Sequence, residues 1–154
     1  MLFQIKLFIN LFVLSLISVQ TDMFVYQKQP LEGIDLIITN IRNKKGLIQI
    51  GMYDSDKGYP DKPEVSFSFK KDSLASGTLK LFLMVKKSGT FALSILDDEN
   101  MNEKMDYRLG IIPKEGFAFS NNPKIRGMKE PPFEVTRFFY GGGRMVLTVR
   151  MVYI

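Results

Sequence analysis

Hydrophobic and polar residues alternate with a period of two along most of the chain after residue 32. Successive side chains of a β-strand point to opposite faces, so this period predicts strands with one buried face each. The alternating apolar positions are Ile34, Leu36, Ile38; Ile48, Ile50, Met52; Val65, Phe67, Phe69; Leu79, Leu81, Leu83, Val85; Phe91, Leu93, Ile95; and Met145, Leu147, Val149, Met151. Phe133 and Val135 predict a further short strand, and no stretch carries a capped helical pattern.

About seven short strands of this kind predict an all-β domain over residues 33–154, built as a sandwich of two packed antiparallel sheets. The turns between them contain residues that suit hairpins, namely Asn43-Lys44-Lys45-Gly46, Lys87-Ser88-Gly89 and Gly141-Gly142-Gly143. Two longer connections, 54–64 and 97–132, break the regularity. Long loops in a compact domain usually serve a purpose, so we expect any functional residues there.

The N-terminus has the features of an export signal. Lys6 gives a small positive region, and the stretch from Leu7 to Val19 is almost entirely apolar. As a helix this stretch would rise about 20 Å, less than the roughly 30 Å hydrocarbon core of a bilayer. We expect a signal peptide over 1–20 and a linker over 21–32, with an uncleaved anchor or a buried strand as alternatives. The protein is then exported, to the periplasm, the outer surface or the medium.

The amino-acid composition excludes several kinds of catalytic and metal site. The 154 residues are 45% hydrophobic, which suits one domain with a real core. The chain contains no His and no Cys, so it has no Ser-His-Asp triad, no Cys-His pair, no His-ligated zinc and no disulfide. A net charge of +5 favours acidic partners in general. The sequence contains no known motif for recognising the grooves of DNA or RNA, so we do not expect nucleic-acid binding.

Several segments occur in an order that resembles a known family. They are Gly51-Met52-Tyr53-Asp54-Ser55 with Gly58-Tyr59-Pro60, the stretch from Ala92 to Asn102, the stretch from Pro113 to Asn122, and Pro131-Pro132-Phe133. Together they resemble the family called domain of unknown function 2141, over roughly residues 32–152. The resemblance implies an exported bacterial domain with an immunoglobulin- or transthyretin-like sandwich. It implies no particular activity.

One loop carries calcium-type spacing. The family's acidic loop reads H-D-x-N-x-N-G-x-x-D, and this chain has Asp98, Asn100, Asn102 and Asp106 at the corresponding positions. Alternating oxygen ligands of this kind wrap around a hard cation. Three departures count against metal: Asp97 replaces the His, Glu103 replaces the Gly, and Leu109 stands where a closing carboxylate belongs. A polar turn rich in Asx residues is the other interpretation.

The stretch after this loop offers candidate ligand-binding residues. Ser120, Asn121 and Asn122 have the donors and acceptors to bind a sugar or peptide, and Tyr107 or Phe133 offers a stacking surface. The plainer interpretation is that these polar side chains bond loop backbone that has no strand partner. Phe117 and Phe119 have strand spacing and are predicted to lie in the core.

These observations favour a non-catalytic exported domain, binding or structural, that is monomeric and acts on an unknown envelope or extracellular partner. It touches a membrane only through the N-terminal segment, if that is uncleaved. A calcium-stabilised version of the same module is one alternative, and calcium is the only cofactor we consider. A small hydrolase using two carboxylates is the other; Asp54, Asp98, Asp106 and Glu115 are available for it.

Overall fold

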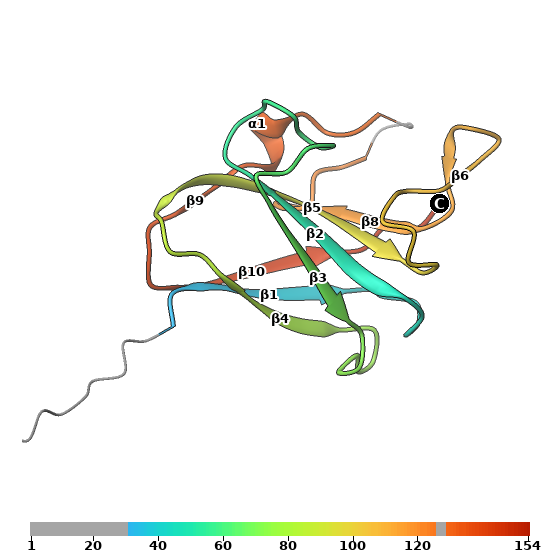
Figure 1. The fold of residues 1–154 in the computed structure, drawn as a ribbon, viewed down its shortest axis with the longest axis horizontal. Coiled ribbons are helices and arrows are strands. Elements are labelled where there is room, and N and C mark those ends of the chain that lie inside the picture. The colour runs from blue at the N-terminus through green and yellow to red at the C-terminus, as the bar shows by residue number, and fades with distance from the viewer. Residues whose placement is uncertain (1–30, 126–128) are drawn as a thin grey trace, which may run out of the picture.

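A computed structural model describes residues 31–125 and 129–154, and the predicted signal peptide and most of the linker lie outside these ranges. The elements are β1 (Gly33–Thr39), β2 (Leu47–Tyr53), β3 (Val65–Lys70), β4 (Leu79–Met84), β5 (Gly89–Asp98), β6 (Tyr107–Arg108), β7 (Ile112–Pro113), β8 (Gly116–Phe119), α1 (Phe133–Thr136), β9 (Phe138–Tyr140) and β10 (Arg144–Arg150). Two main sheets stack as a β-sandwich, which confirms the predicted fold class (Figure 1).

The first sheet has the order β10-β1-β4. Strand β4 runs antiparallel to β1, but β10 runs parallel to it, with Gly33 opposite Arg144 and Thr39 opposite Arg150. The prediction of purely antiparallel sheets is therefore wrong for this pair. A parallel partner needs a crossover rather than a tight turn, and most of the chain lies between the two strands.

The second sheet has the order β3-β2-β5-β8, with β9 pairing the start of β5. Strand β5 is its longest member, and its two halves pair with different strands: Phe91 lies opposite Phe138, while Asp97 lies opposite Gly116. A separate two-stranded ribbon, β6-β7, extends from the body beyond β8 (Figure 1).

The core lies between the two sheets and uses the predicted alternating positions. Leu36, Leu83, Ile50 and Leu93 are almost completely buried, and they come from β1, β4, β2 and β5 respectively. Tyr140 from β9 closes one end of this core and donates its hydroxyl to the backbone oxygens of Val85 and Gly143. One continuous apolar layer thus joins the two sheets.

Three local predictions are wrong. The turns at 43–46, 87–89 and 141–143 join strands that lie in different sheets or are not paired, so none of them closes a hairpin. Phe133 and Val135 belong to the one-turn helix α1, which follows two prolines at 131–132 and leaves Val135 exposed. The predicted long loop 97–132 contains β6, β7 and β8.

Phe117 and Phe119 form strand β8 as expected, but they do not face the core between the sheets. Ala118, between them, is the residue that joins the core. Phe117 lies opposite Leu96 and Phe119 opposite Ser94, on the outer face of the second sheet. The aromatic side chains therefore cover the outside of the sandwich.

Candidate functional site

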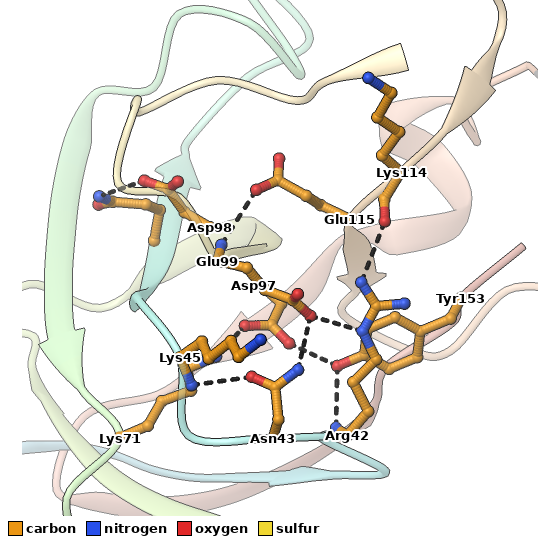
Figure 2. Close-up of polar contacts among 11 residues, drawn as sticks. Arg42, Asn43, Lys45, Lys71, Asp97, Asp98, Glu99, Lys114, Glu115 and Tyr153 are labelled. Atoms are coloured by element: carbon orange, nitrogen blue, oxygen red, sulfur yellow. Dashed lines mark hydrogen bonds and ion pairs between the residues drawn. The ribbon is translucent and has the colours of Figure 1, made fainter. Parts of the chain in front are cut away.

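Three charged or polar side chains meet inside one end of the sandwich (Figure 2). Lys71 Nζ forms an ion pair with Asp97 Oδ1, and neither side chain has any exposed surface. The Tyr153 hydroxyl donates to the other carboxylate oxygen, Asp97 Oδ2, at 2.5 Å. Burial and this hydrogen bond to Asp97 raise the pKa of the Tyr153 phenol. The phenol therefore remains a proton donor at physiological pH.

Sequence reasoning missed this cluster, although the sequence contains its signal. The apolar alternation 65, 67, 69 continues to Lys71, the alternation 91, 93, 95 continues to Asp97, and the alternation 145, 147, 149, 151 continues to Tyr153. Three inward-facing stripes thus end on groups that can pair with one another. Gly116 makes room for the cluster, because a Cβ at that position would collide with the Tyr153 ring.

A second polar layer covers the cluster on the solvent side. The Arg42 guanidinium lies 4.6 Å from the centre of the Tyr153 ring, and its Nε donates to Glu99 Oε1 at 2.5 Å. Asn43 donates to the same oxygen at 3.1 Å. Burial acts to raise the pKa of Glu99, but the hydrogen bonds from Arg42 and Asn43 outweigh it, and the pKa is lowered.

The acidic loop begins beside this layer, where the buried carboxylate of Asp98 organises its backbone. Asp98 Oδ1 accepts the N–H of Asn102 at 3.1 Å, and Oδ2 accepts the N–H of Glu103 at 3.0 Å. Glu103 has a positive φ of 63°. The family's Gly at this position therefore has a conformational reason, because only Gly adopts such a φ without steric cost.

Asn100, Asn102 and Asp106 come together on the outer side of the loop. Asp106 Oδ2 accepts from Asn100 Nδ2 at 2.6 Å and from Asn102 Nδ2 at 3.2 Å. The two asparagine oxygens accept backbone N–H groups two residues further on, as in Asx turns. Leu109 is exposed at 85% and lies on the ribbon. Over residues 31–125 and 129–154, no three His, Cys, Asp or Glu side chains are grouped to hold a metal ion, and calcium binding stays a prediction.

Glu115 supports the loop from behind and was not among the predicted loop ligands. Its Oε1 accepts the backbone N–H of Glu99 at 3.0 Å, and its Oε2 accepts that of Asp106 at 3.3 Å. Burial raises the pKa of Glu115 despite these two bonds. The carboxylate therefore links the two ends of the acidic loop.

The structure gives the predicted ligand residues Ser120, Asn121 and Asn122 backbone partners. Ser120 is fully buried; its Oγ accepts the N–H of Leu93 at 2.8 Å and donates to the oxygen of Thr136 at 2.6 Å. Asn121 Nδ2 donates to the oxygen of Arg137 at 2.7 Å. Asn122 binds the backbone of β10. These contacts agree with the plainer interpretation of this stretch.

Phe133 and Tyr107 lie in different places and form no common stacking surface. Phe133, in α1, is buried and packs edge-on against Tyr59, with ring centres 5.8 Å apart. The Tyr59 hydroxyl is itself buried and makes no hydrogen bond of standard geometry among the described residues; burial raises its pKa to about 12, although the Thr136 side chain acts to lower it. Tyr107, in β6, is 45% exposed.

A groove of about 750 Å³ crosses the outer face of the second sheet. The floor of the groove is polar on one side and aromatic on the other. Ser66 and Ser68 of β3 and Gln49 of β2 form the polar side, and Phe117 and Phe119 of β8 form the aromatic side. Pro60, Asp61 and Pro63 of the connection between β2 and β3 form one wall, and the start of the β6-β7 ribbon with Tyr107 forms another. Sequence reasoning named Tyr107 but missed Ser66 and Ser68, which lie on the polar face of a predicted half-buried strand.

The charges around this groove are mixed. Asp61, Glu103 and Glu130 are acidic, while Lys104 and Lys129 are basic. These lining residues therefore create no electrostatic field of a single sign that would attract a charged ligand. No helix in the described part of the chain is long and apolar enough to cross a bilayer.

Comparison with known proteins gives one result. No curated protein and no solved structure is similar enough to the chain to count as a match. The profile of a bacterial family matches residues 36–148, which run from within β1 to within β10 and include the acidic loop and most of the groove. The chain therefore belongs to the family described as "Uncharacterized protein conserved in bacteria (DUF2141)".

Proposed function

We propose that this protein is a non-catalytic, exported binding domain whose ligand lies in the groove on the outer face of the β3-β2-β5-β8 sheet. The groove itself is the observation that carries the proposal. A depression of about 750 Å³ on the outer face of a sheet falls within the size range of small-molecule sites. Its walls are formed by two connections that extend beyond the strands.

A floor that is polar on one side and aromatic on the other favours a neutral, hydroxyl-rich ligand such as an oligosaccharide. Ser66, Ser68 and Gln49 offer hydrogen-bond donors and acceptors on one side, and Phe117 offers an aromatic surface on the other. A sugar ring has an apolar C–H face and a polar rim, so it can contact both sides at once. The mixed charges at the groove's edge also favour an uncharged ligand over a charged one.

Two of the four carboxylates that the sequence offers for hydrolysis are used to organise the acidic loop, which supports a binding role for the groove. Asp98 and Glu115 are buried, and their oxygens accept backbone N–H groups of the acidic loop. A glycosidase needs two carboxylates that face each other across bound substrate. The side chains of Asp98 and Glu115 hold the fold together instead.

The test compares binding by two tyrosine variants. Ser68 is an exposed floor residue, and Ser68→Tyr places a bulky ring in the groove at little cost in stability. Ser73→Tyr makes the same change at an exposed position outside the groove and serves as the matched control. An array of neutral oligosaccharides is probed first, and any that bind are titrated by calorimetry.

We expect Ser68→Tyr to weaken binding about tenfold or more, equal to about 1.4 kcal/mol, and Ser73→Tyr to bind like the wild type. If Ser68→Tyr and wild type bind with the same affinity, the groove is not the site. If the wild type retains no neutral oligosaccharide, the proposed ligand class is wrong.

A further inference from the structure

Lys71 and Asp97 are in contact but belong to different parts of the second sheet. Lys71 directly follows β3, Asp97 lies near the end of β5, and β2 runs between these two strands. The two residues are 26 positions apart in the chain, and both side chains are fully buried. The side-chain nitrogen of Lys71 and the carboxyl group of Asp97 are thus held in contact away from solvent.

The hydrogen bonding of Lys71 is incomplete for an ammonium group. A lysine ammonium carries three N–H donors. In the described parts of the chain, Asp97 Oδ1 is the one acceptor that the Lys71 Nζ contacts. A buried charge with unmatched donors costs free energy. A secondary amide has a single N–H, and it would carry no charge into this site.

Tyr153 occupies the position from which a donor would assist amide formation. Its hydroxyl points to Asp97 Oδ2, the oxygen that Lys71 does not contact, at 2.5 Å. The phenol keeps its proton because burial and Asp97 raise its pKa. A fixed donor at a carbonyl oxygen stabilises negative charge that develops there during acyl transfer.

We propose that Lys71 and Asp97 condense to form an intramolecular isopeptide bond. One proton passes from Nζ to Oδ1, which leaves an amine facing a carboxylic acid. The Nζ lone pair attacks Cγ, and Oδ2 takes up negative charge beside the Tyr153 hydroxyl. Nζ then gives a second proton to the Oδ1 hydroxyl, which departs as water while the Cγ–Oδ2 double bond re-forms. The products are one amide and one water, and no oxidant or other reactant is needed.

The bond would supply a covalent link that this chain otherwise lacks, because its sequence contains no Cys. It would join the end of edge strand β3 to the inner strand β5, so β3 could no longer separate from the sheet. Closing a loop of this length restricts the unfolded chain in the same way as a disulfide. Unlike a disulfide, an amide is resistant to reduction.

The test is mass spectrometry on the full chain, purified in the folded state and then unfolded and digested with trypsin. An amidated Lys71 resists cleavage, so fragment 71–80 remains attached to fragment 88–104. We expect this branched peptide in the wild type, lighter by one water than the sum of its two parts. Two separate linear peptides from folded wild-type protein, after prolonged incubation, would overturn the proposal.

Four variants distinguish the cross-link from an ordinary ion pair. Lys71→Arg keeps the positive charge but abolishes the branched peptide, while Lys70→Arg, at the adjacent exposed lysine, leaves it intact. Asp97→Asn gives the same branched peptide with loss of ammonia instead of water. Tyr153→Phe slows its formation by roughly 100-fold, the usual effect of losing one such donor. If Lys71→Arg fails to fold, the wild type and Asp97→Asn still decide the matter, and absence of the branched peptide from both contradicts the bond.

Discussion

Asn122 and Arg150 are paired across the outer edge of β10: Asn122 Oδ1 accepts the backbone N–H of Arg150 at 2.7 Å. Asn122 Nδ2 donates to the backbone oxygen of Thr148 at 2.9 Å. One carboxamide therefore makes the two bonds that a neighbouring strand would make. Open strand edges invite pairing with other chains, so Asn122 covers part of a surface that would otherwise favour aggregation.

Removing this side chain should destabilise the fold. We expect Asn122→Gly to lower the free energy of unfolding in urea by about 1–2 kcal/mol, because two neutral hydrogen bonds are lost. Glycine suits the positive φ of 48° at this position, so backbone strain does not confuse the result. Ser76→Gly is the control, since Ser76 is exposed, also has a φ of 48° and should lose no stability. Equal values for the two variants would contradict the role of Asn122.

Loss of the hydroxyl group should destabilise the fold at Tyr53 but not at Tyr59. The Tyr53 hydroxyl donates to the oxygen of Pro60 and lies 3.0 Å from Ser94 Oγ. The Tyr59 hydroxyl is buried without a partner in the described structure. We expect Tyr53→Phe to cost about 1 kcal/mol of unfolding free energy and Tyr59→Phe to be neutral or stabilising. A larger loss for Tyr59→Phe would mean that its hydroxyl does have a partner.

The acidic loop should keep its form without calcium. The amides of Asn100 and Asn102 already donate to Asp106, and Asp98 is bonded to the backbone. We therefore expect the same thermal midpoint in EDTA and in millimolar calcium. A calcium ion present at 100 times its dissociation constant would add about 2.7 kcal/mol, which raises the midpoint measurably. A rise that disappears in Asp98→Ala would instead establish the calcium-stabilised module.

The contact between Arg42 and Glu99 should make stability depend on acidic pH. Because the folded state lowers the pKa of Glu99 below 4.5, it binds fewer protons there than the unfolded chain does. The stabilisation is complete above the unfolded pKa and is lost as the pH falls through the folded one. We expect Glu99→Gln to flatten this part of the stability profile, measured by urea unfolding across the acidic range. Glu64→Gln, at an exposed carboxyl without an ion pair in the described structure, should leave the profile unchanged.

The sequence predicted where the strands lie because each main strand buries one face, which imposes a period of two. It did not predict which strands pair. Turn residues such as Gly46 and Gly89 report the local backbone, and the same residues serve a hairpin or a crossing between sheets. The pairing of β1 with β10 depends on contacts between residues more than 100 positions apart, which no local pattern records.

Site residues could be predicted from the sequence only where an unexpected residue type stands at a position that a known pattern already defines. Glu103 was recognised as a departure because a Gly is expected there, and its positive φ agrees with that. The groove was not foreseen, because Ser66 and Ser68 become a floor only when distant connections fold over them. Lys71, Asp97 and Tyr153 could have been found by extending each apolar stripe by one more step.

The parallel pairing of β10 with β1 also bears on the order in which the protein acquires its structure. Strand β1 is the middle strand of its sheet, yet β10, one of its two partners, lies more than 100 residues later in the chain. Contacts so distant in sequence form slowly. The first sheet therefore cannot be complete until β10 has been synthesised, so β1 waits for one of its two neighbours while β2 to β9 are made.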